Sequence, residues 1–554
     1  MNYPKIPLAQ TIVALCQAKQ IKHIVICPGS RNAPLTIGFT ENPFFKVYSI
    51  VDERAAAFFA LGIAQQTGHP VAVICTSGSA VLNFYPAIAE AFYSDIPLLV
   101  ISADRPPHFI DIGDGQTIRQ ENIFEKHILY SANLKIEEEH QKYNETQINV
   151  AINSAIELNG PVHINAPFEE PLYLKVDVPT VIPQHVPVKE KNHSLTENLN
   201  DFATIWNNAK RKLILVGVQQ PDALSQKNIE LLAADPGVLV MTETTSNLHH
   251  KNFICSIDQL IAPLNEAEFN ELQPEVLLTF GGMVISKKIK AFLRTFPAKH
   301  HWHVDEKKAY DTYFYLGHHF KTTPESFFNT FLPFTKSLES NYQSHWLEVK
   351  NKRVQKHGEY LQNIPFTDFK AFHHILNFLP KNSVLQLGNS AIVRYAQLFM
   401  LDNSLHVFCN RGTSGIDGST STAIGAAVAT HKPVVFITGD LSFFYDANGL
   451  WNNYIPKNFK IILINNNGGG IFRILPGEKD TPNFDKYFET IHSLSAKQLC
   501  EMHQINYRFT DNEAGLEKEL TAFFNYNEKP SLIEIKTPRT INDKVLLDYF
   551  QFLK

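Results

Sequence analysis

The chain has 554 residues, which corresponds to three or four domains at the usual size of roughly 150 residues each. Lys and Arg number 50 and Asp and Glu 55, so the net charge is −5, which argues against a nucleic-acid binder or a protein of membrane surfaces. No uncharged apolar run approaches the roughly 18 residues of a membrane span, and the six cysteines form no C-x-x-C pair, so we expect a cytoplasmic protein with buried free thiols.

Short β-branched runs alternate with helix-length segments along the whole chain. In chain order the runs cover 23–27, 71–75, 97–102, 162–165, 212–217, 238–242, 276–280, 383–388, 405–409, 434–439, 460–465 and 531–536. Strands that are apolar on both faces and separated by helices are typical of parallel sheets covered by helices. The sequence therefore predicts an α/β protein with doubly wound domains.

Two polar stretches divide the chain. Segment 178–192 carries three prolines followed by charged residues, which indicates an extended linker. A second boundary falls in the polar, helix-prone stretch 337–364. We therefore expect domains at 1–180, 190–340 and 360–554.

Residues 60–104 can be laid over residues 423–467. Both segments show a helix, a turn, a strand, a glycine turn, a second helix and a second strand, with Gly-x-Ala and Pro-Val pairs in the same order. Any two doubly wound units share part of this pattern. The shared order of these pairs nevertheless favours an internal duplication.

The stretch Asn465 to Gly470 follows a predicted strand directly, and Gly439 and Asp440 end the strand before it. Asp440 and Asn466 are separated by one strand-helix-strand unit, so both should lie at the carboxyl edge of a parallel sheet, where such sheets bind ligands. A carboxylate, a carboxamide oxygen and a free carbonyl oxygen suit Mg²⁺, and glycines let backbone N–H groups approach an anion. An Asn-Gly turn alone is common. With Gly-Asp at this spacing, the pattern indicates a metal-bridged diphosphate site.

This pattern resembles the signature of the thiamin-diphosphate enzymes, with Leu441 where that superfamily usually has glycine. The resemblance implies thiamin diphosphate bound through Mg²⁺, or Mn²⁺ as an alternative, with Asp440, Asn466 and the carbonyl of Gly468 as metal ligands. It also implies that block 1–180 binds the pyrimidine and block 360–554 the diphosphate, with block 190–340 as a central α/β domain. Further cofactor contacts implied in this way are Ser77, Gly78, Gly439, Leu441, Ser442, Ile471 and Ile416, the last as an apolar wedge that bends the cofactor.

Thiamin chemistry needs a carboxylic acid beside N1′ of the aminopyrimidine ring. Glu53 lies at a strand end and opens a helix of small and aromatic residues, whereas Asp52 and Arg54 are offset from its direction by one residue. An apolar pocket would keep such a carboxyl group protonated near neutral pH. An acid at a helix N-terminus can also serve the helix dipole alone. In the superfamily the catalytic glutamate begins the second strand-helix unit, and Glu53 occupies that place, so the resemblance implies that Glu53 is catalytic.

Four arginines follow predicted strands beside Pro or Gly turns: Arg31, Arg105, Arg394 and Arg411. A single arginine of this kind is usually solvated. Because guanidinium groups bind carboxylates bidentately, four at sheet edges suggest substrates with several carboxylates.

Together with 113–120 and 465–476, these motifs closely resemble the 2-succinyl-5-enolpyruvyl-6-hydroxy-3-cyclohexene-1-carboxylate synthases of menaquinone biosynthesis over essentially the whole chain. The resemblance implies decarboxylation of 2-oxoglutarate and 1,4-addition of the succinic semialdehyde carbanion equivalent to isochorismate. It implies a homodimer or homotetramer whose sites lie between two subunits. Implied substrate contacts are Ser30, Arg31, Arg105, Gln116, Lys287, Ser390, Arg394, Arg411 and Phe472. Gly115 stands where this family often has Asn, and Lys288 where Arg is common.

Two other functions fit parts of the sequence. One is another thiamin-dependent 2-oxoacid decarboxylase or an acetolactate-synthase-like carboligase. The other is a noncatalytic protein that keeps the thiamin fold, although the presence of Glu53, Asp440 and Asn466 argues against it.

Overall fold

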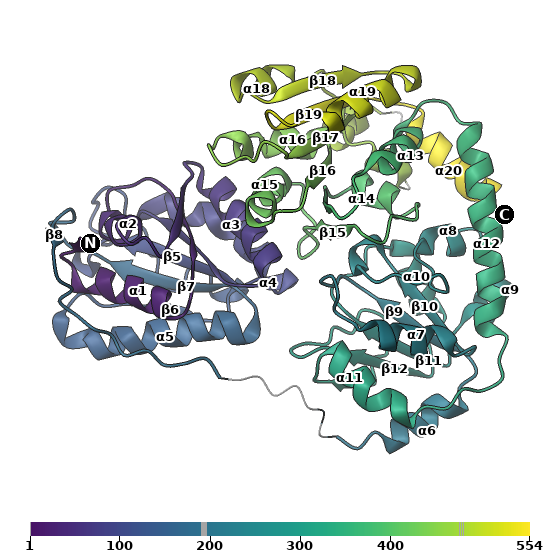
Figure 1. Ribbon diagram of the computed structural model, residues 1–554, viewed down its shortest axis with the longest axis horizontal. Helices are drawn as coiled ribbons and strands as arrows, with labels where there is room; N and C mark the ends of the chain where they lie inside the picture. The colour runs from purple at the N-terminus through teal and green to yellow at the C-terminus, as the bar shows by residue number, and fades with distance from the viewer. Residues whose placement is uncertain (1, 190–194, 196, 476, 478, 480) are drawn as a thin grey trace.

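Three α/β units, each built around one parallel sheet, make up the computed structural model (Figure 1). The structure describes residues 2–189, 195, 197–475, 477, 479 and 481–554. We call the three parts the N-terminal unit (3–176), the central unit (200–334) and the C-terminal unit (368–552). In Figure 1 they lie at the left, the lower right and the upper right, respectively.

The N-terminal unit has a six-stranded parallel sheet with the order β3-β2-β4-β5-β7-β6. Its strands are β2 (His23–Ile26), β3 (Lys46–Ser49), β4 (Val71–Cys75), β5 (Leu98–Asp104), β6 (Ser131–Asn133) and β7 (Val162–Pro167). The helices are α1 (Pro7–Ala18), α2 (Ala33–Thr40), α3 (Glu53–Thr67), α4 (Tyr85–Ser94) and α5 (Gln141–Leu158). A separate antiparallel pair joins β1 (Tyr3–Pro4) to β8 (Lys175–Val176).

The C-terminal unit repeats this topology with the order β15-β14-β16-β17-β19-β18. Its strands are β14 (Val384–Leu387), β15 (His406–Cys409), β16 (Val434–Gly439), β17 (Lys460–Asn465), β18 (Asn506–Thr510) and β19 (Ser531–Lys536). Its helices are α13 (Asp368–Phe378), α14 (Ala391–Ala396), α15 (Ser419–Ala429), α16 (Asp440–Tyr445), α17 (Ile471–Ile474), α18 (Lys497–Met502), α19 (Glu513–Asn525) and α20 (Asn542–Phe552). Numbered in chain order within each unit, both sheets read 2-1-3-4-6-5, so the two blocks share one topology, as the predicted duplication requires.

The central unit has a five-stranded parallel sheet with the order β10-β9-β11-β12-β13. The strands are β9 (Lys212–Val216), β10 (Val238–Thr242), β11 (Val276–Phe280), β12 (His300–Val304) and β13 (His318–Phe320). The helices are α6 (Asn200–Asn208), α7 (Gln226–Ala234), α8 (Ile257–Ile261), α9 (Glu266–Leu272), α10 (Lys287–Thr295) and α11 (Pro324–Phe331). Short 3₁₀ or π turns across the chain are η1 (Gly78–Phe84), η2 (Pro107–Phe109), η3 (Glu125–His127), η4 (Glu138–His140), η5 (Thr244–Ser246), η6 (Leu332–Phe334), η7 (Ala447–Leu450) and η8 (Phe484–Glu489).

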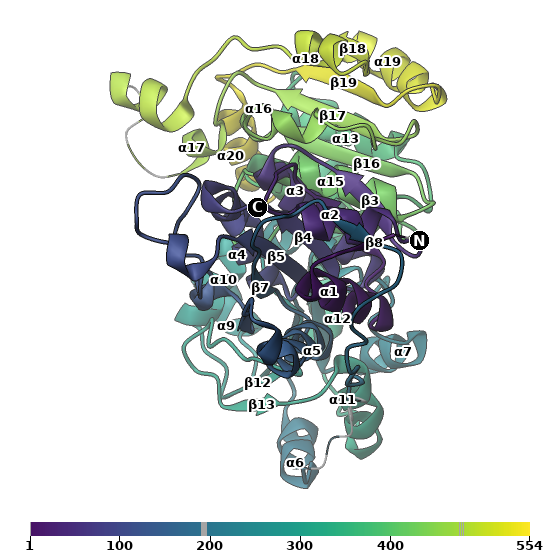
Figure 2. The ribbon, with the colours of Figure 1, turned by 90° about the vertical axis from the view of Figure 1, so that its left-hand side faces the viewer.

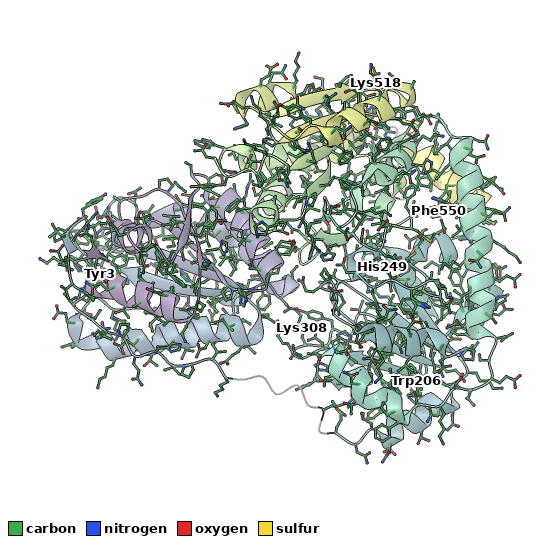
Figure 3. The ribbon with its side chains drawn as sticks, viewed as in Figure 1. Tyr3, Trp206, His249, Lys308, Lys518 and Phe550 are labelled. Atoms are coloured by element: carbon green, nitrogen blue, oxygen red, sulfur yellow. The ribbon has the colours of Figure 1, made fainter. Side chains whose placement is uncertain are left out.

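Two features join the central unit to its neighbours. The long helix α12 (Tyr342–Gln362) runs along its side, with Trp346 in the core of the central unit and Leu361 in that of the C-terminal unit (Figure 1). Lys308, labelled in Figure 3, lies at the junction with the N-terminal unit, where its Nζ is 3.0 Å from Asp95 Oδ2. Lys307 pairs with the same carboxylate.

The predicted α/β class is confirmed, and all twelve predicted strands are present with ends within two residues of the prediction. The strands β3, β6, β13 and β18 were not predicted, because they are edge strands whose partly solvated residues need no apolar pattern on both faces. The interior strand β12 also lies outside the twelve predicted runs, because three histidines interrupt its apolar pattern. All six cysteines are free and five are buried. Across the described residues, the helices are too short or too polar to span a bilayer.

Helices α3 and α15 lie side by side between the N-terminal and C-terminal sheets (Figures 1 and 2). Both are buried on nearly every side, which is unusual for a helix unless it lies between two layers. They touch at Gly62 and Gly425, equivalent positions of the repeat. A Cβ at Gly62 would lie 2.1 Å from the carbonyl oxygen of Thr422, and a Cβ at Gly425 would lie 2.1 Å from that of Phe59. The N-terminal and C-terminal units therefore share one core, and only glycine fits at this crossing.

We expect Gly62→Ala to destabilise the protein by about 1–3 kcal/mol, because the added methyl group meets backbone that cannot rotate away. Gly358→Ala is the matched control, since Gly358 lies inside α12 with open space where the Cβ would be. There we expect a gain of about 0.5–1 kcal/mol from helix propensity. Calorimetric unfolding midpoints measure both changes. An unchanged midpoint for Gly62→Ala would contradict the tight crossing.

Candidate active site

Asp440 is the first residue of α16 and follows β16 at the carboxyl edge of the C-terminal sheet. Its side chain is buried and accepts two backbone hydrogen bonds. Leu441 N–H donates to Oδ1 at 2.7 Å, and Gly468 N–H donates to Oδ2 at 3.0 Å. His492 Nε2 lies 3.2 Å from the same Oδ2 without hydrogen-bond geometry. Because β16 and β17 are neighbours in the sheet, the carboxylate faces the glycine turn that follows β17.

Asn466 lies in that turn, and a buried acid fixes its carboxamide. Its Nδ2 donates to Asp368 Oδ2 at 2.9 Å, and Thr537 Oγ1 donates to Oδ1 of the same carboxylate at 2.6 Å. Burial raises the pKa of Asp368 to about 6, although these hydrogen bonds oppose the shift. With Nδ2 held by Asp368, Asn466 Oδ1 is turned away from that acid. Asp368 has no sequence motif of its own and was not predicted.

The glycines of the turn are required by their surroundings. Gly468 has a φ of 151°, and a Cβ there would lie 2.7 Å from the carbonyl oxygen of Glu489. Gly469 N–H donates to this carbonyl oxygen at 2.6 Å. The Gly468 carbonyl is not free as expected, because it accepts Gly470 N–H at 3.0 Å, but its second lone pair remains for a ligand. The edge thus presents a carboxylate, a carboxamide oxygen and a glycine carbonyl, which are the hard oxygen donors that Mg²⁺ takes together with phosphate oxygens. These residues fit a metal-bound diphosphate.

An ion-pair cluster closes the loop after this turn. The carboxylate of Glu489 is fully buried and lies 2.5 Å from Arg473 Nη2 and 2.6 Å from Arg539 Nη1. Arg473 directly follows Ile471 and Phe472, a predicted cofactor contact and a predicted substrate contact. Phe472 is 36% exposed, so its ring is open to a ligand.

Glu53 begins α3, as predicted, and Asp52 caps the helix by accepting Ala55 N–H at 3.0 Å. The neighbours of Glu53 point toward the C-terminal unit. Asp52 Oδ2 accepts Asn448 Nδ2 at 2.7 Å, and Arg54 Nη2 donates to the Tyr445 carbonyl at 3.0 Å. Glu53 itself is only partly buried.

The single chain does not supply the apolar pocket expected around Glu53. Its Oε2 accepts Asn83 Nδ2 at 3.2 Å, and Asn83 is exposed. The neighbouring side chains of Val51 and Leu82 are 44% and 45% exposed. Within the described ranges, Glu53 makes no hydrogen bond or ion pair with Asp440 or with the glycine turn.

The predicted substrate residues of the N-terminal unit gather at the carboxyl edge of its sheet. Arg31 is buried, and its Nη1 donates to the Phe168 carbonyl at 2.9 Å. Burial and the nearby charge of Arg105 lower the pKa of Arg31. Arg105 Nη2 donates to the carbonyl of Gly115 at 3.3 Å, so this departure from the family pattern still contacts the site through its backbone. The Nε atoms of both arginines are buried without a hydrogen-bond partner.

The predicted cofactor residues of this unit lie next to them. A Cβ at Gly78 would lie 3.3 Å from the backbone of Gln116, which places Gln116 over the turn that begins η1. Ser77 Oγ is buried and lacks a hydrogen-bond partner. Ser30, directly before Arg31, is exposed. A site that binds a polar ligand is expected to leave such buried polar atoms without a partner in the absence of the ligand.

A second group lies at the edge of the C-terminal sheet. Arg394 Nη1 donates to the Ser390 carbonyl at 2.6 Å, and Arg411 Nη1 donates to Asn389 Oδ1 at 2.8 Å. Burial and the charge of Arg411 lower the pKa of Arg394. Asn389, which the sequence did not single out, also donates to the carbonyls of Asn410 and Gly415, both at 2.7 Å. Neither arginine forms an ion pair with a carboxylate of the described chain.

The central unit contributes the N-terminus of α10. Ser286 caps the helix, and Lys287 is its exposed first residue. The next residue turns away, because Lys288 Nζ lies 5.0 Å from the ring centroid of Phe550 in α20. Lys288, which stands where the family commonly has Arg, thus makes a cation–π contact outside the predicted site.

The remaining predicted cofactor residues lie around α16. Ser442 Oγ donates to the Ile416 carbonyl at 2.7 Å, so the loop that carries Arg411 and Ile416 rests on this helix. Ile416 is 37% exposed. Gly439 precedes Asp440 and is the N-cap of α16. In one chain the predicted site residues therefore form two groups, and no hydrogen bond or ion pair among described residues joins them.

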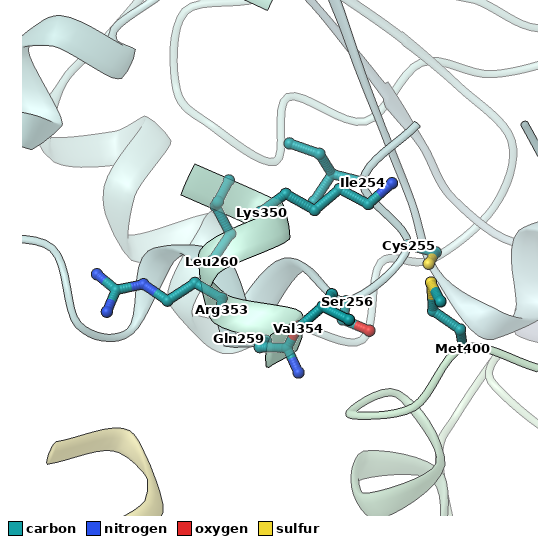
Figure 4. Close-up of a pocket in the computed structure, with 9 residues that line it drawn as sticks. All are labelled: Ile254, Cys255, Ser256, Gln259, Leu260, Lys350, Arg353, Val354 and Met400. Atoms are coloured by element: carbon teal, nitrogen blue, oxygen red, sulfur yellow. The ribbon is translucent and has the colours of Figure 1, made fainter. Parts of the chain in front are cut away.

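Two cavities lined by residues of the central unit differ in size. The larger, of about 460 Å³, lies where the three units meet and is lined by Tyr93, Gly281, Lys290 and Arg411 among others. The smaller, of about 10 Å³, lies between α8 and α12, with the sulfur atoms of Cys255 and Met400 facing each other (Figure 4). It holds about one water molecule and contains none of the predicted site residues.

Comparisons with known proteins match the same three parts of the chain. Residues 6–127 match the N-terminal TPP binding domain of thiamine pyrophosphate enzymes, and residues 388–535 match the C-terminal TPP binding domain. Residues 183–387 match the family described as the middle domain of thiamine pyrophosphate. A 2-succinyl-5-enolpyruvyl-6-hydroxy-3-cyclohexene-1-carboxylate synthase of Christiangramia forsetii is 57% identical over the full length of both chains.

The chain belongs to this synthase family. A synthase of the same name from Flavobacterium psychrophilum is also 57% identical over the full length of both chains. A more distant one, from Porphyromonas gingivalis, is 36% identical over 98% of this chain and 96% of its own. The family resemblance predicted from the motifs is thereby confirmed, and the chain is an enzyme that depends on thiamin diphosphate.

Proposed function

We propose that the protein binds thiamin diphosphate through Mg²⁺, or Mn²⁺, and uses it to decarboxylate 2-oxoglutarate and to add the remaining four-carbon unit to isochorismate. The observation that carries this proposal is the neighbouring pair Arg394 and Arg411 at the edge of the C-terminal sheet: Arg411 is buried, Arg394 is half-buried, and neither forms an ion pair with a carboxylate of the described chain. Two unneutralised guanidinium groups are costly to bury unless a ligand supplies negative charge. Both proposed substrates carry two carboxylates, which fit such a pair bidentately.

The cofactor and metal would be held by the edge described above. Asp440, Asn466 and the Gly468 carbonyl would bind the metal, while Gly439, Leu441, Ser442 and Ile471 would surround the diphosphate and Ile416 would support the bent cofactor. When bound, thiamin diphosphate supplies a nucleophilic carbon and an electron sink for the loss of CO₂. Block 360–554 is thus the proposed diphosphate-binding domain and block 1–180 the proposed pyrimidine-binding domain.

This chain's own side chains would hold the proton and bind the substrate carboxylates. Glu53 would hold the proton at N1′ of the pyrimidine ring, which a water-excluded pocket favours. Arg31, Arg105, Gln116 and Ser30 would orient one substrate from the N-terminal unit, with Ser77 and Gly78 against the cofactor. Lys287, Ser390, Arg394, Arg411 and Phe472 would do so from the other units.

A homodimer completes this site. Glu53 lies outside an apolar pocket in one chain and does not reach Asp440 of the same chain, so the two halves would meet across a subunit interface. Exposed apolar side chains in both units support this arrangement, with Leu82 of the N-terminal unit at 45% exposure and Tyr487 of the C-terminal unit at 67%. A homotetramer would be a pair of such dimers. We propose the cytoplasm as its location.

The test is loss of isochorismate absorbance, with release of CO₂, when the protein is mixed with 2-oxoglutarate, thiamin diphosphate and Mg²⁺. Release of CO₂ from pyruvate in place of 2-oxoglutarate would instead favour an acetolactate-synthase-like carboligase. A calorimetric titration without any binding of thiamin diphosphate would favour the noncatalytic alternative.

The proposed metal site predicts a role for Asp368. We expect Asp368→Ala to raise the Mg²⁺ concentration needed for half-maximal cofactor binding by about 10- to 100-fold, because Asn466 loses the partner that orients its carboxamide. Asp368→Asn should restore most of the affinity, since its carboxamide oxygen can still accept from Asn466. Calorimetry at several Mg²⁺ concentrations measures the change. Equal affinities for wild type and Asp368→Ala would contradict it.

A further inference from the structure

Glu90 of α4 is a buried acid that contacts the C-terminal unit. Only 1% of its surface is exposed, and its carboxylate accepts four hydrogen bonds. Gly412 N–H donates to Oε1 at 2.8 Å, and Thr413 donates to Oε2 through its N–H at 2.7 Å and its Oγ1 at 2.8 Å. The fourth donor is Ser94 Oγ of the same helix, at 2.7 Å from Oε1. Three of the four bonds thus hold a loop from a distant part of the sequence.

This loop, residues 410–418, connects β15 to α15 and is pressed against α4. A Cβ at Gly412 would lie 2.6 Å from the Glu90 carbonyl oxygen and 2.8 Å from Ser94 Oγ. The glycine therefore permits a close approach that brings two backbone N–H groups to one carboxylate. A carboxylate is suited to this place because both its oxygens only accept, whereas a carboxamide would turn one N–H₂ group toward a donor.

Asn389 of the C-terminal unit holds the same loop. Its Nδ2 donates to the carbonyls of Asn410 and Gly415, and its Oδ1 accepts Arg411 Nη1. The loop is therefore fixed by two buried side chains, one from its own unit and one from the N-terminal unit. Between them lies Arg411, whose Nε is buried without a hydrogen-bond partner.

We propose that Glu90 is a positioning residue for substrate binding, which acts by fixing the loop so that the Arg411 guanidinium is held ready for a substrate carboxylate. This inference rests on the proposed function, in which Arg411 binds a substrate. Among the described residues, no hydrogen bond or ion pair joins Glu90 to Arg411, so it acts through the neighbouring residues 412 and 413. It does so within one chain, whereas Glu53 of the same unit is proposed to serve the site of the partner. The N-terminal unit would then contribute to two active sites at once.

A double-mutant cycle tests whether Glu90 acts through Arg411. We expect Glu90→Gln to lower kcat/KM about 10- to 100-fold, mainly through a higher KM for the substrate that Arg411 binds. Arg411→Ala should lower it at least as much, and the double variant should lie within about 3-fold of Arg411→Ala, because the two residues form one unit. Multiplicative losses in the double variant, or a Glu90→Gln enzyme within 2-fold of wild type, would overturn the proposal.

Two variants separate this role from simple stabilisation of the interface. Ser94→Ala removes a hydrogen bond to Glu90 within α4 but none to the loop, so it should keep kcat/KM within about 3-fold of wild type. Thr413→Val removes only the hydroxyl bond and should fold even if Glu90→Gln does not. Its kcat/KM should fall by about 3- to 10-fold, corresponding to one charge-assisted hydrogen bond, and no loss would count against the proposal.

Hydrogen exchange supplies a readout that does not depend on turnover. In Glu90→Gln, the amides of Gly412 and Thr413 should exchange at least about 10-fold faster, while the buried strands of the C-terminal sheet keep their protection. If wild type shows no turnover with the two substrates, the proposed function fails, yet faster exchange would still show that Glu90 holds the loop. Unchanged exchange at 412 and 413 would overturn that placement of Glu90.

Discussion

Glu53→Gln lowers kcat for the synthase reaction by about 10²- to 10⁴-fold, the range expected when a group that transfers a proton is removed. Glutamine keeps the size and the hydrogen-bonding capacity of the side chain but cannot release or accept a proton at N1′. Because the change is nearly isosteric and Glu53 sits at a helix N-terminus, α3 should still form. Cofactor affinity measured by calorimetry should therefore change by less than about 10-fold, and steady-state kinetics record the loss.

The matched control is Asp52→Asn, one residue earlier in the same turn. Asparagine also caps helices well, and its Oδ1 can still accept Ala55 N–H. The variant loses only the exposed hydrogen bond from Asn448 of its own chain, because its Nδ2 cannot accept, so it should keep kcat within about 3-fold of wild type. Similar losses in both variants would show that the helix start, rather than a proton on Glu53, is what the reaction needs. Undiminished turnover of Glu53→Gln would remove the residue from its role.

Asp440→Ala weakens Mg²⁺-dependent binding of thiamin diphosphate by at least about 100-fold, because it removes the one charged side chain of the proposed ligand set. The effect is enlarged by the loss of the acceptor for Gly468 N–H, which holds the glycine turn against α16. Titrations of the cofactor in the presence of Mg²⁺ measure the change. Wild type treated with a chelator should behave like the variant, since both lack the bound metal.

Asp511→Ala serves as the control for this experiment. Asp511 is an exposed acid of the same unit, at the end of β18, and its loss should leave cofactor affinity unchanged. Cofactor binding by Asp440→Ala that responds to Mg²⁺ as wild type does would place the metal elsewhere. Binding by wild type that ignores the chelator would show that the diphosphate is held without a metal.

Much of the fold could be predicted because its strands are buried on both faces. A strand such as β17 must be apolar at every position, so its sequence alone reveals it. β6 and β18 escaped prediction because each lies at a sheet edge and is partly solvated. The close contact of α3 and α15 was not predicted either, because a Gly-x-Ala pattern does not indicate which backbone segment approaches the glycine.

Some residues of the candidate site could likewise be predicted from the sequence, and others could not. Asp440 and Asn466 could be paired because consecutive parallel strands place their ends together, and their spacing in the chain is fixed by that geometry. Asp368 could not be found, because it is 98 residues from the Asn466 that it orients. Lys288 stands where the family commonly has Arg, and only the structure shows that its ammonium group lies over Phe550. The four arginines, expected at sheet edges that face one cofactor, form two groups within a single chain.

The sequence by itself determined the α/β class, the repeated unit and the oxygen-rich turn, because each of these is a local pattern imposed by burial or by backbone conformation. Tertiary structure alone decided which buried acids serve that turn and the loop of Arg411. Glu90 and Gly412 are 322 residues apart and meet only because two sheets pack through α3, α4 and α15. Such contacts depend on how complete layers of helices and sheets pack together, and no short stretch of residues determines that packing.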